Sequence, residues 1–142
     1  MARVFLDANV FLYAVGGEGP QRQPCRDLLQ AVGDGEIEAV TNAEVLREIL
    51  HVRSRRVNIK DAVLAVRAAS DLVREVFPVR REDVLDACRL LERHPGLGAR
   101  DAVHVAVMKN GSVHLLVSVD GDFDVLKEIK RLSPKDALGL AR

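Results

Sequence analysis

Short apolar runs alternate with longer amphipathic stretches along the whole chain. The short runs have the length of buried strands, and the longer stretches carry apolar residues at the three- and four-residue spacing of helices. This alternation is typical of an α/β domain with a mainly parallel central sheet flanked by helices. The predicted strands are residues 3–6, 36–41, 76–79, 113–119 and 129–132, the last at a sheet edge, and the predicted helices are residues 10–15, 25–32, 42–55, 59–74, 81–93 and 99–110, with a short helix after residue 120.

The predicted helix at residues 99–110 is apolar almost all round, which is typical of an element buried inside a domain. Asp101 nevertheless lies in its first turn. A lone aspartate at this place has an ordinary explanation, because it can accept hydrogen bonds from free N–H groups and interacts favourably with the helix dipole. Other acids stand at comparable places: Asp7 ends the first predicted strand, Asp120 follows the fourth, and Glu48 lies in the helix after the second. The pattern therefore favours one shared acidic site.

The carboxyl ends of parallel strands meet at one edge of a sheet, where ligands of α/β domains bind. Carboxylates crowded into a partly buried cleft repel one another and raise one another's pKa unless cations neutralise them. A set of oxygen ligands without histidine or cysteine favours Mg²⁺ or Mn²⁺ over zinc. The acids therefore predict a divalent-metal site at this edge.

The chain has 142 residues, the usual length of one domain, so residues 1–142 are predicted to form a single unit. Lys plus Arg and Asp plus Glu both number 21, so the net charge does not indicate a nucleic-acid partner by itself. No apolar run is long enough to span a bilayer and no signal peptide precedes the first strand, so we expect a cytoplasmic protein. Cys25 and Cys88 lie among apolar neighbours and are predicted to be buried thiols.

Four segments of the sequence carry these acids: FLDANVFLY, EVLREIL, ARDAVHVAVM and LVSVDGDFD. Together they resemble the four acidic motifs of the PIN domain, a family of metal-dependent ribonucleases that includes the toxins of VapBC toxin–antitoxin pairs. The resemblance spans nearly the whole chain and implies a three-layer PIN-like fold. It also implies catalytic, metal-binding acids at Asp7, Glu48, Asp101 and Asp120, with Asp122 as a further ligand and Asn9, Ser118, Glu44 and Asp124 as supporting residues.

The second acid has two candidates on one helix face. In the family a small polar residue at the strand end stands six positions before the glutamate, as Asn42 stands before Glu48. Glu44, one turn earlier, is the alternative. Ser118 replaces the threonine that the family commonly has in the last motif, and its retained hydroxyl is expected to orient a carboxylate or a water.

Phosphodiester hydrolysis needs a nucleophilic water and a stabilised leaving oxygen, and paired divalent ions supply both. We therefore expect no protein nucleophile. The resemblance implies an endoribonuclease that uses Mg²⁺ or Mn²⁺ to activate water and leaves a 5′-phosphate. It also implies that the protein is the toxin of a type II toxin–antitoxin pair.

A basic segment at residues 51–60 and an arginine beside the third acid are candidates for contacts with RNA phosphates. Solvated helix ends are the alternative explanation for such charges. Aromatic residues make up 4% of the chain, so a platform of stacked bases is not expected. The candidate RNA-binding residues are Arg53, Arg55, Arg56 and Arg100.

The helix at residues 59–74 carries more apolar residues than one core face requires. The excess predicts either a homodimer or antitoxin surface, or simply the core of a helical hairpin. The residues concerned are Val63, Leu64, Val66, Leu72 and Val73.

Two other functions compete with this prediction. A phosphatase with an aspartyl nucleophile would need a second aspartate two residues after Asp7, where this chain has Asn9. A non-catalytic RNA- or protein-binding module on the same fold would be expected to lack some of the acids.

Overall fold

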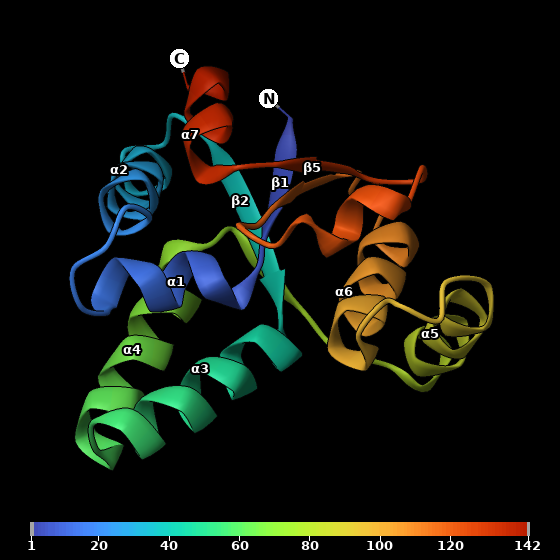
Figure 1. Cartoon of the computed structure of the whole chain (residues 1–142). Helices are drawn as coiled ribbons and strands as arrows, with labels where there is room; N and C mark the ends of the chain where they lie inside the picture. Colours follow the sequence, from blue (N-terminus) through green and yellow to red (C-terminus); the bar gives the residue numbers. More distant parts are fainter. Residues whose placement is uncertain (1, 142) are drawn as a thin grey trace.

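Five parallel strands form the centre of the molecule in a computed structural model that describes residues 2–141 (Figure 1). The sheet order is β3-β2-β1-β4-β5, so the first strand lies in the middle. Phe5 of the first strand lies opposite Val40 on one side and Leu116 on the other. The strands are β1 (Arg3–Leu6), β2 (Glu38–Asn42), β3 (Glu75–Phe77), β4 (Leu115–Val117) and β5 (Lys130–Leu132).

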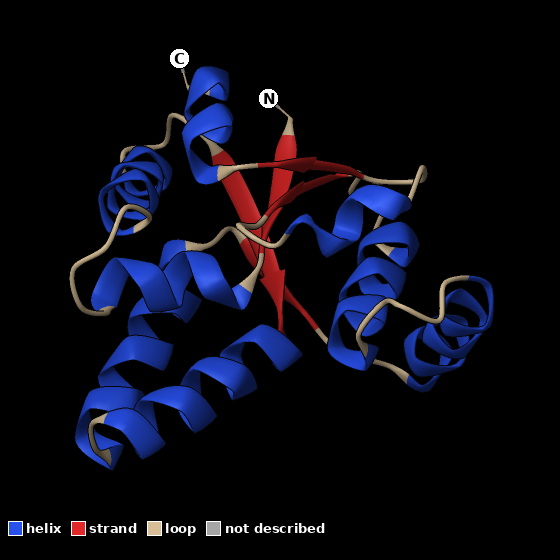
Figure 2. Cartoon of the chain, in the orientation of Figure 1, coloured by secondary structure: helices blue, strands red, loops and turns tan. Residues whose placement is uncertain are grey.

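Helices cover both faces of this sheet (Figures 1 and 2). The packed pair α5 and α6 lies on one side, and α1 to α4 lie on the other, with α3 and α4 forming a helical hairpin. The predicted three-layer α/β fold is therefore confirmed. The helices are α1 (Ala8–Val15), α2 (Arg22–Gly33), α3 (Ala43–Arg56), α4 (Ile59–Leu72), α5 (Arg81–Arg93), α6 (Ala99–Asn110) and α7 (Pro134–Ala137), with 3-10 turns η1 (Gly121–Val125) and η2 (Leu138–Leu140).

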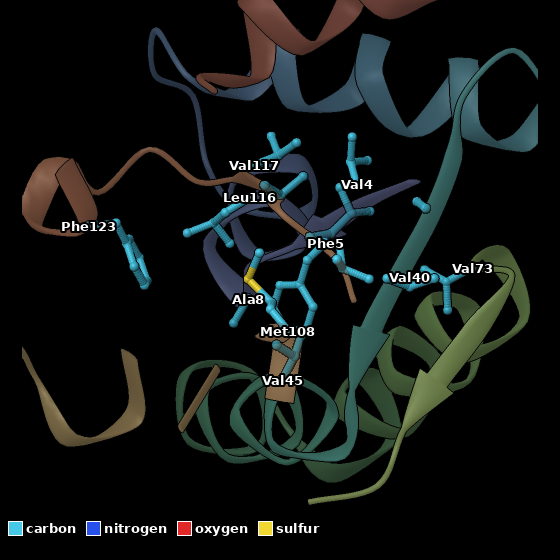
Figure 3. Close-up of a cluster of buried hydrophobic side chains, with 14 of the residues drawn as sticks. Val4, Phe5, Ala8, Val40, Val45, Val73, Met108, Leu116, Val117 and Phe123 are labelled. Carbon is cyan, nitrogen blue, oxygen red and sulfur yellow. The ribbon is translucent and has the colours of Figure 1, made fainter. Parts of the chain in front are cut away.

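The central strand explains the position of the hydrophobic core. Val4, Phe5 and Leu6 of β1 have no exposed surface, because a middle strand is covered on both faces. Met108 of α6 packs into the same cluster, and Figure 3 shows its side chain next to that of Phe5. The end of β1 is therefore fixed on all sides, which makes it a rigid support for the residues that follow it.

Several element boundaries differ from the sequence prediction, and one short helix was missed. β4 is shorter than the predicted 113–119, because Val113 is buried without joining the sheet ladder and the N–H of Val119 bonds to the side chain of Asn9 instead of a strand. α2 begins at Arg22, three residues before the predicted start. The sequence prediction also missed α7, although Ser133 caps it by accepting a hydrogen bond from the Asp136 N–H.

The prediction for the second cysteine was wrong. Cys25 is fully buried, and this burial raises the pKa of its thiol to about 11. Cys88 is exposed because α5 turns Ala87 and Leu90 toward the core and presents Cys88 on the opposite side.

The apolar residues of α4 divide between the two expected roles. Val73, just after the helix, is buried, and Val66 and Leu72 pack against the core. Leu64 is 61% exposed. Most of the additional apolar residues of α4 therefore belong to the hairpin core, and a smaller number are exposed. None of the helices within residues 2–141 is long and apolar enough to cross a membrane.

Candidate active site

Acidic side chains from four separate segments gather at the edge of the sheet where β1 and β2 end. Figure 1 shows α1, α3 and α6 all beginning at this edge. The electrostatics of Asp101 reflect this gathering, because burial and then the charges of Asp7, Asp120, Glu48 and Asp122 together raise its pKa to about 7. These five residues, named here the acidic group, are the five that the sequence proposed as metal ligands.

Asp7 is held firmly at the start of α1. Its carboxylate accepts hydrogen bonds from the Ser118 hydroxyl (2.8 Å) and from the N–H of Ala8 (2.8 Å). Its pKa is raised, mainly because the side chain is buried, and the nearby charge of Asp120 adds to this effect while the two hydrogen bonds oppose it. Asp7 is thus a nearly buried carboxylate with fixed orientation.

Ser118 connects the first and last acidic motifs. Its hydroxyl donates to Asp7 and accepts from the side-chain amide of Asn9 (2.9 Å) and from the N–H of Asp120 (3.0 Å). One donor and two acceptor positions are all that a hydroxyl offers, and the side chain is fully buried. Of the two roles expected for Ser118, orienting carboxylates therefore fits its contacts.

Asp101 does not act as the cap of α6. The N-cap position belongs to Gly98, and within residues 2–141 no side-chain or backbone group donates a hydrogen bond to the Asp101 carboxylate. Its oxygens consequently remain available to a ligand. The ordinary explanation for this acid, helix capping, does not account for it.

Glu48 and Glu44 both approach the acidic group but have different partners. Arg100 donates to Glu48 (2.9 Å) and lies 3.9 Å from Glu44. Arg47 binds Glu44 through two nitrogens at 2.6 and 3.1 Å, which lowers the pKa of Glu44. Glu48 is the glutamate better placed to join the acidic group, because its charge, and not that of Glu44, is among those that raise the pKa of Asp101.

The loop after β4 fixes the fourth acid. The Asp120 carboxylate accepts from the Asp122 N–H (2.9 Å) and so caps the turn η1. Asp124 receives two hydrogen bonds from Arg131, at 2.8 and 3.0 Å, which lower its pKa, and the same arginine donates to the Ser118 carbonyl (3.0 Å). Asp124 therefore stabilises this loop. Both oxygens of its carboxylate accept hydrogen bonds from Arg131, so they are not free to bind a metal.

His104 lies beside the site although it was not among the predicted site residues. Asn42 caps α3 by accepting from the Val45 N–H, so its amide nitrogen must be the group that faces His104 Nδ1 at 3.0 Å. Burial lowers the pKa of His104 to about 4, so the ring is neutral and carries its proton on Nε2, 3.8 Å from Asp7 Oδ1. The sequence does contain an indication of this position, because His104 lies three residues after Asp101 and therefore on the same helix face.

The donor chemistry of the acidic group fits divalent cations. All its ligand atoms are carboxylate oxygens, and crowded carboxylates are stabilised by a cation between them. Within residues 2–141, no three acidic, histidine or cysteine side chains converge on one point at metal-ligand spacing. The contacts explain this spacing, since Glu48 is drawn toward Arg100 while Asp7 and Asp120 are held by hydrogen bonds.

The candidate RNA-binding arginines lie outside this group and differ in their freedom. Arg53 is largely buried and binds Asp61 through two nitrogens at 2.7 and 3.2 Å. Arg55 and Arg56 are exposed at the end of α3. Within the described residues, Arg55 and Arg56 can therefore meet a ligand without breaking an ion pair, whereas Arg53 is paired with Asp61 and Arg100 with Glu48.

Comparison with known proteins places this chain in a family. The PIN domain model matches residues 4–129. The chain is 39% identical over 138 residues to ribonuclease VapC7 of Mycobacterium tuberculosis, covering 96% of this chain and 94% of the relative. It is 38% identical over 120 residues to ribonuclease VapC23 of the same species, covering 82% of this chain and 92% of the relative.

Solved structures agree on the fold. VapC20 of M. tuberculosis, described as a toxin that cleaves the sarcin-ricin loop, matches with a TM-score of 0.73 at 22% identity, over 86% of this chain and 93% of VapC20. VapBC from Salmonella typhimurium, solved bound to DNA, matches with a TM-score of 0.73 at 12% identity, over 94% and 99% of the two chains. The chain therefore belongs to the PIN domain family, and its similarity to VapC ribonucleases extends over nearly its whole length.

Proposed function

We propose that this protein is an endoribonuclease that depends on Mg²⁺ or Mn²⁺ and serves as the toxin of a type II toxin–antitoxin pair. The observation that carries the proposal is the gathering of four carboxylates from other segments around the partly buried Asp101, whose pKa burial and these charges raise. Similarity to proteins named VapC ribonucleases supports RNA as the substrate. A non-catalytic binding module would have no use for such a costly concentration of negative charge.

The residues proposed to hold the metal are the acidic group, with Asp7, Glu48, Asp101 and Asp120 as the principal ligands. When bound, divalent cations lower the pKa of water and stabilise the leaving oxygen of a phosphodiester. Ser118 holds the carboxylate of Asp7 and the backbone of Asp120 at a fixed separation. The protein thus supplies a preorganised set of oxygens and no nucleophile of its own.

RNA binding requires positive charge next to this acidic group, since phosphates and carboxylates repel each other. Arg55 and Arg56 extend from the end of α3 and are proposed to contact phosphates remote from the cleaved bond. Arg53 is proposed to act indirectly, by fixing the α3–α4 turn through Asp61. Electrostatic binding of this kind weakens steeply with salt.

The proposed protein partner is an antitoxin. Structural neighbours include toxin–antitoxin complexes from Klebsiella pneumoniae and Haemophilus influenzae. The hairpin of this chain exposes apolar side chains, with Ile59 66% and Leu64 61% exposed, as a protein-binding surface would. A homodimer and a cytoplasmic location are part of the same proposal.

The proposal is tested with purified protein and a panel of structured and single-stranded RNAs. Cleavage is expected with Mg²⁺ or Mn²⁺ and is expected to stop in excess chelator. Asp101→Asn, purified in parallel, controls for contaminating nucleases. Cleavage that continues in chelator, or equally in the variant, contradicts the assignment, whereas RNA binding without cleavage under all metal conditions supports the binding-module alternative.

A further inference from the structure

Arg100 occupies an unusual position beside the acidic group. It lies in the first turn of α6, two residues after the N-cap Gly98 and immediately before Asp101. Its guanidinium reaches α3 and donates to Glu48 at 2.9 Å. The Glu48 side chain is 19% exposed, whereas that of Arg100 is 54% exposed. The ion pair therefore joins a mostly buried member of the acidic group to a side chain that is itself about half in water.

The charge balance of the site makes this contact informative. Within residues 2–141, Arg100 is the one charged basic side chain in a salt bridge with the acidic group. The other arginines nearby have partners outside it: Arg47 binds Glu44 and Arg131 binds Asp124. His104 is close to Asp7 but neutral, since burial lowers its pKa to about 4. Arg100 thus takes the position relative to Glu48 that a cation would otherwise take.

We propose that Arg100 is an exchange residue: it neutralises Glu48 until divalent metal binds, and it then leaves Glu48 to hold a phosphate of the RNA. This inference rests on the proposed function and assigns a substrate-binding role within it. Metal and guanidinium compete for the same carboxylate, and a divalent cation also repels the positive charge of Arg100 directly. Release of Arg100 costs little, because its guanidinium is already largely solvated and an ion pair that is screened by water on one side contributes little stability.

The released guanidinium has the chemistry and the position for phosphate. A guanidinium offers paired donors that match two oxygens of a phosphate, and such contacts are among the stronger hydrogen bonds in proteins. Its neighbour along the chain is Asp101, a proposed metal ligand, so a phosphate held by Arg100 lies beside the acidic group. Arg100 therefore reduces the repulsion among the carboxylates in the metal-free protein. In the metal-bound protein it offsets the repulsion between these carboxylates and the RNA phosphates.

The test measures metal binding without RNA and cleavage kinetics separately. Calorimetric titration of Mn²⁺ into Arg100→Gln is expected to show binding about three- to tenfold tighter than in wild type, because a competing positive charge is removed. With metal at saturation, KM for RNA is expected to rise about tenfold with a smaller change in kcat, because a charge-assisted phosphate contact is lost. Arg100→Lys retains the charge, so its metal affinity is expected to stay near that of wild type while its KM rises.

Arg47→Gln is the matched control, since Arg47 is similarly exposed (62%) and similarly paired, but to Glu44. It is expected to leave both metal affinity and KM within about twofold of wild type. Metal affinity that falls or stays unchanged in Arg100→Gln overturns the exchange and indicates a purely structural tie between α3 and α6. Wild-type protein that binds no Mn²⁺ or cleaves no RNA instead contradicts the proposed function itself, so the two failures are distinguishable.

Discussion

Asp101 and Asp124 are both aspartates in the first turn of a helical segment, yet their carboxyl groups have opposite environments. Asp124 is exposed and bound by Arg131, which lowers its pKa. Asp101 is partly buried, has no cationic partner among residues 2–141 and is surrounded by carboxylates, so its pKa rises to about 7. The same residue type is thus a structural brace in one place and a candidate ligand in the other, and only its contacts distinguish the two.

Replacing Asp101 by asparagine is expected to abolish cleavage while stabilising the metal-free protein. The folded state holds the Asp101 proton more strongly than the unfolded state, whose pKa is near the ordinary value of 3.8. Wild-type stability therefore decreases as pH rises from about 4 through about 7, and Asp101→Asn lacks this loss. Urea unfolding in chelator is expected to show the variant more stable, with a gap that widens from pH 5 to pH 8. A gap that is constant with pH would contradict the placement of Asp101 among charges.

The two glutamates of α3 give a second prediction at this scale. Glu48→Gln is expected to reduce kcat by orders of magnitude, because it removes a ligand oxygen from the acidic group. Glu44→Gln is expected to leave most of the activity, because Glu44 is already neutralised by Arg47. Single-turnover cleavage rates at saturating metal measure both effects. The reverse ranking would mean that Glu44, one helical turn earlier, is the second acid.

At the scale of elements, the sequence predicted which segments form strands and helices, because apolar residues recur at the spacing of buried strands and of amphipathic helices. The run at residues 3–6 is apolar since β1 is central, and its end at Asp7 follows directly. Strand lengths were less predictable, because burial extends beyond the hydrogen-bonded ladder at Val113. The sheet order and the ion pair of Arg100 with Glu48 join residues far apart in the chain, and no local pattern contains that information.

The start of α3 provides a prediction for an element. Asn42 caps this helix and also binds buried His104, whereas Asn58 caps α4 in the same manner at an exposed position. Asn42→Ala is expected to cost about 2 kcal/mol of unfolding free energy, from the lost cap and the lost buried hydrogen bond. Asn58→Ala, the matched control, is expected to cost about 1 kcal/mol. Equal losses in urea titrations would mean that the Asn42–His104 bond contributes nothing.

At the scale of the whole molecule, the acidic group depends on nearly the entire chain. Its members come from the end of β1, from α3, from α6 and from the loop after β4, so every layer must be in place before they meet. Local signals in the sequence pointed to these acids because Asp7 and Asp120 follow predicted strands, while Glu48 and Asp101 lie in predicted helices. Their mutual distances, and the hydrogen bonds of Ser118 that fix them, result from the packing of the fold.

Because the acidic group exists only in the folded chain, divalent metal is expected to raise the melting temperature by mass action, and to do so in a pH-dependent manner. Asp101 must lose a proton to bind a cation, so metal affinity is expected to fall by about tenfold per pH unit below its pKa of about 7. Burial raises the pKa of Asp7 as well, which acts in the same direction. Thermal melts with and without Mg²⁺ are expected to show a large shift at pH 7.5 and a small one at pH 5.5, with little shift at either pH in Asp101→Asn. Equal shifts at both pH values in the wild type would show that the cation binds away from these two aspartates.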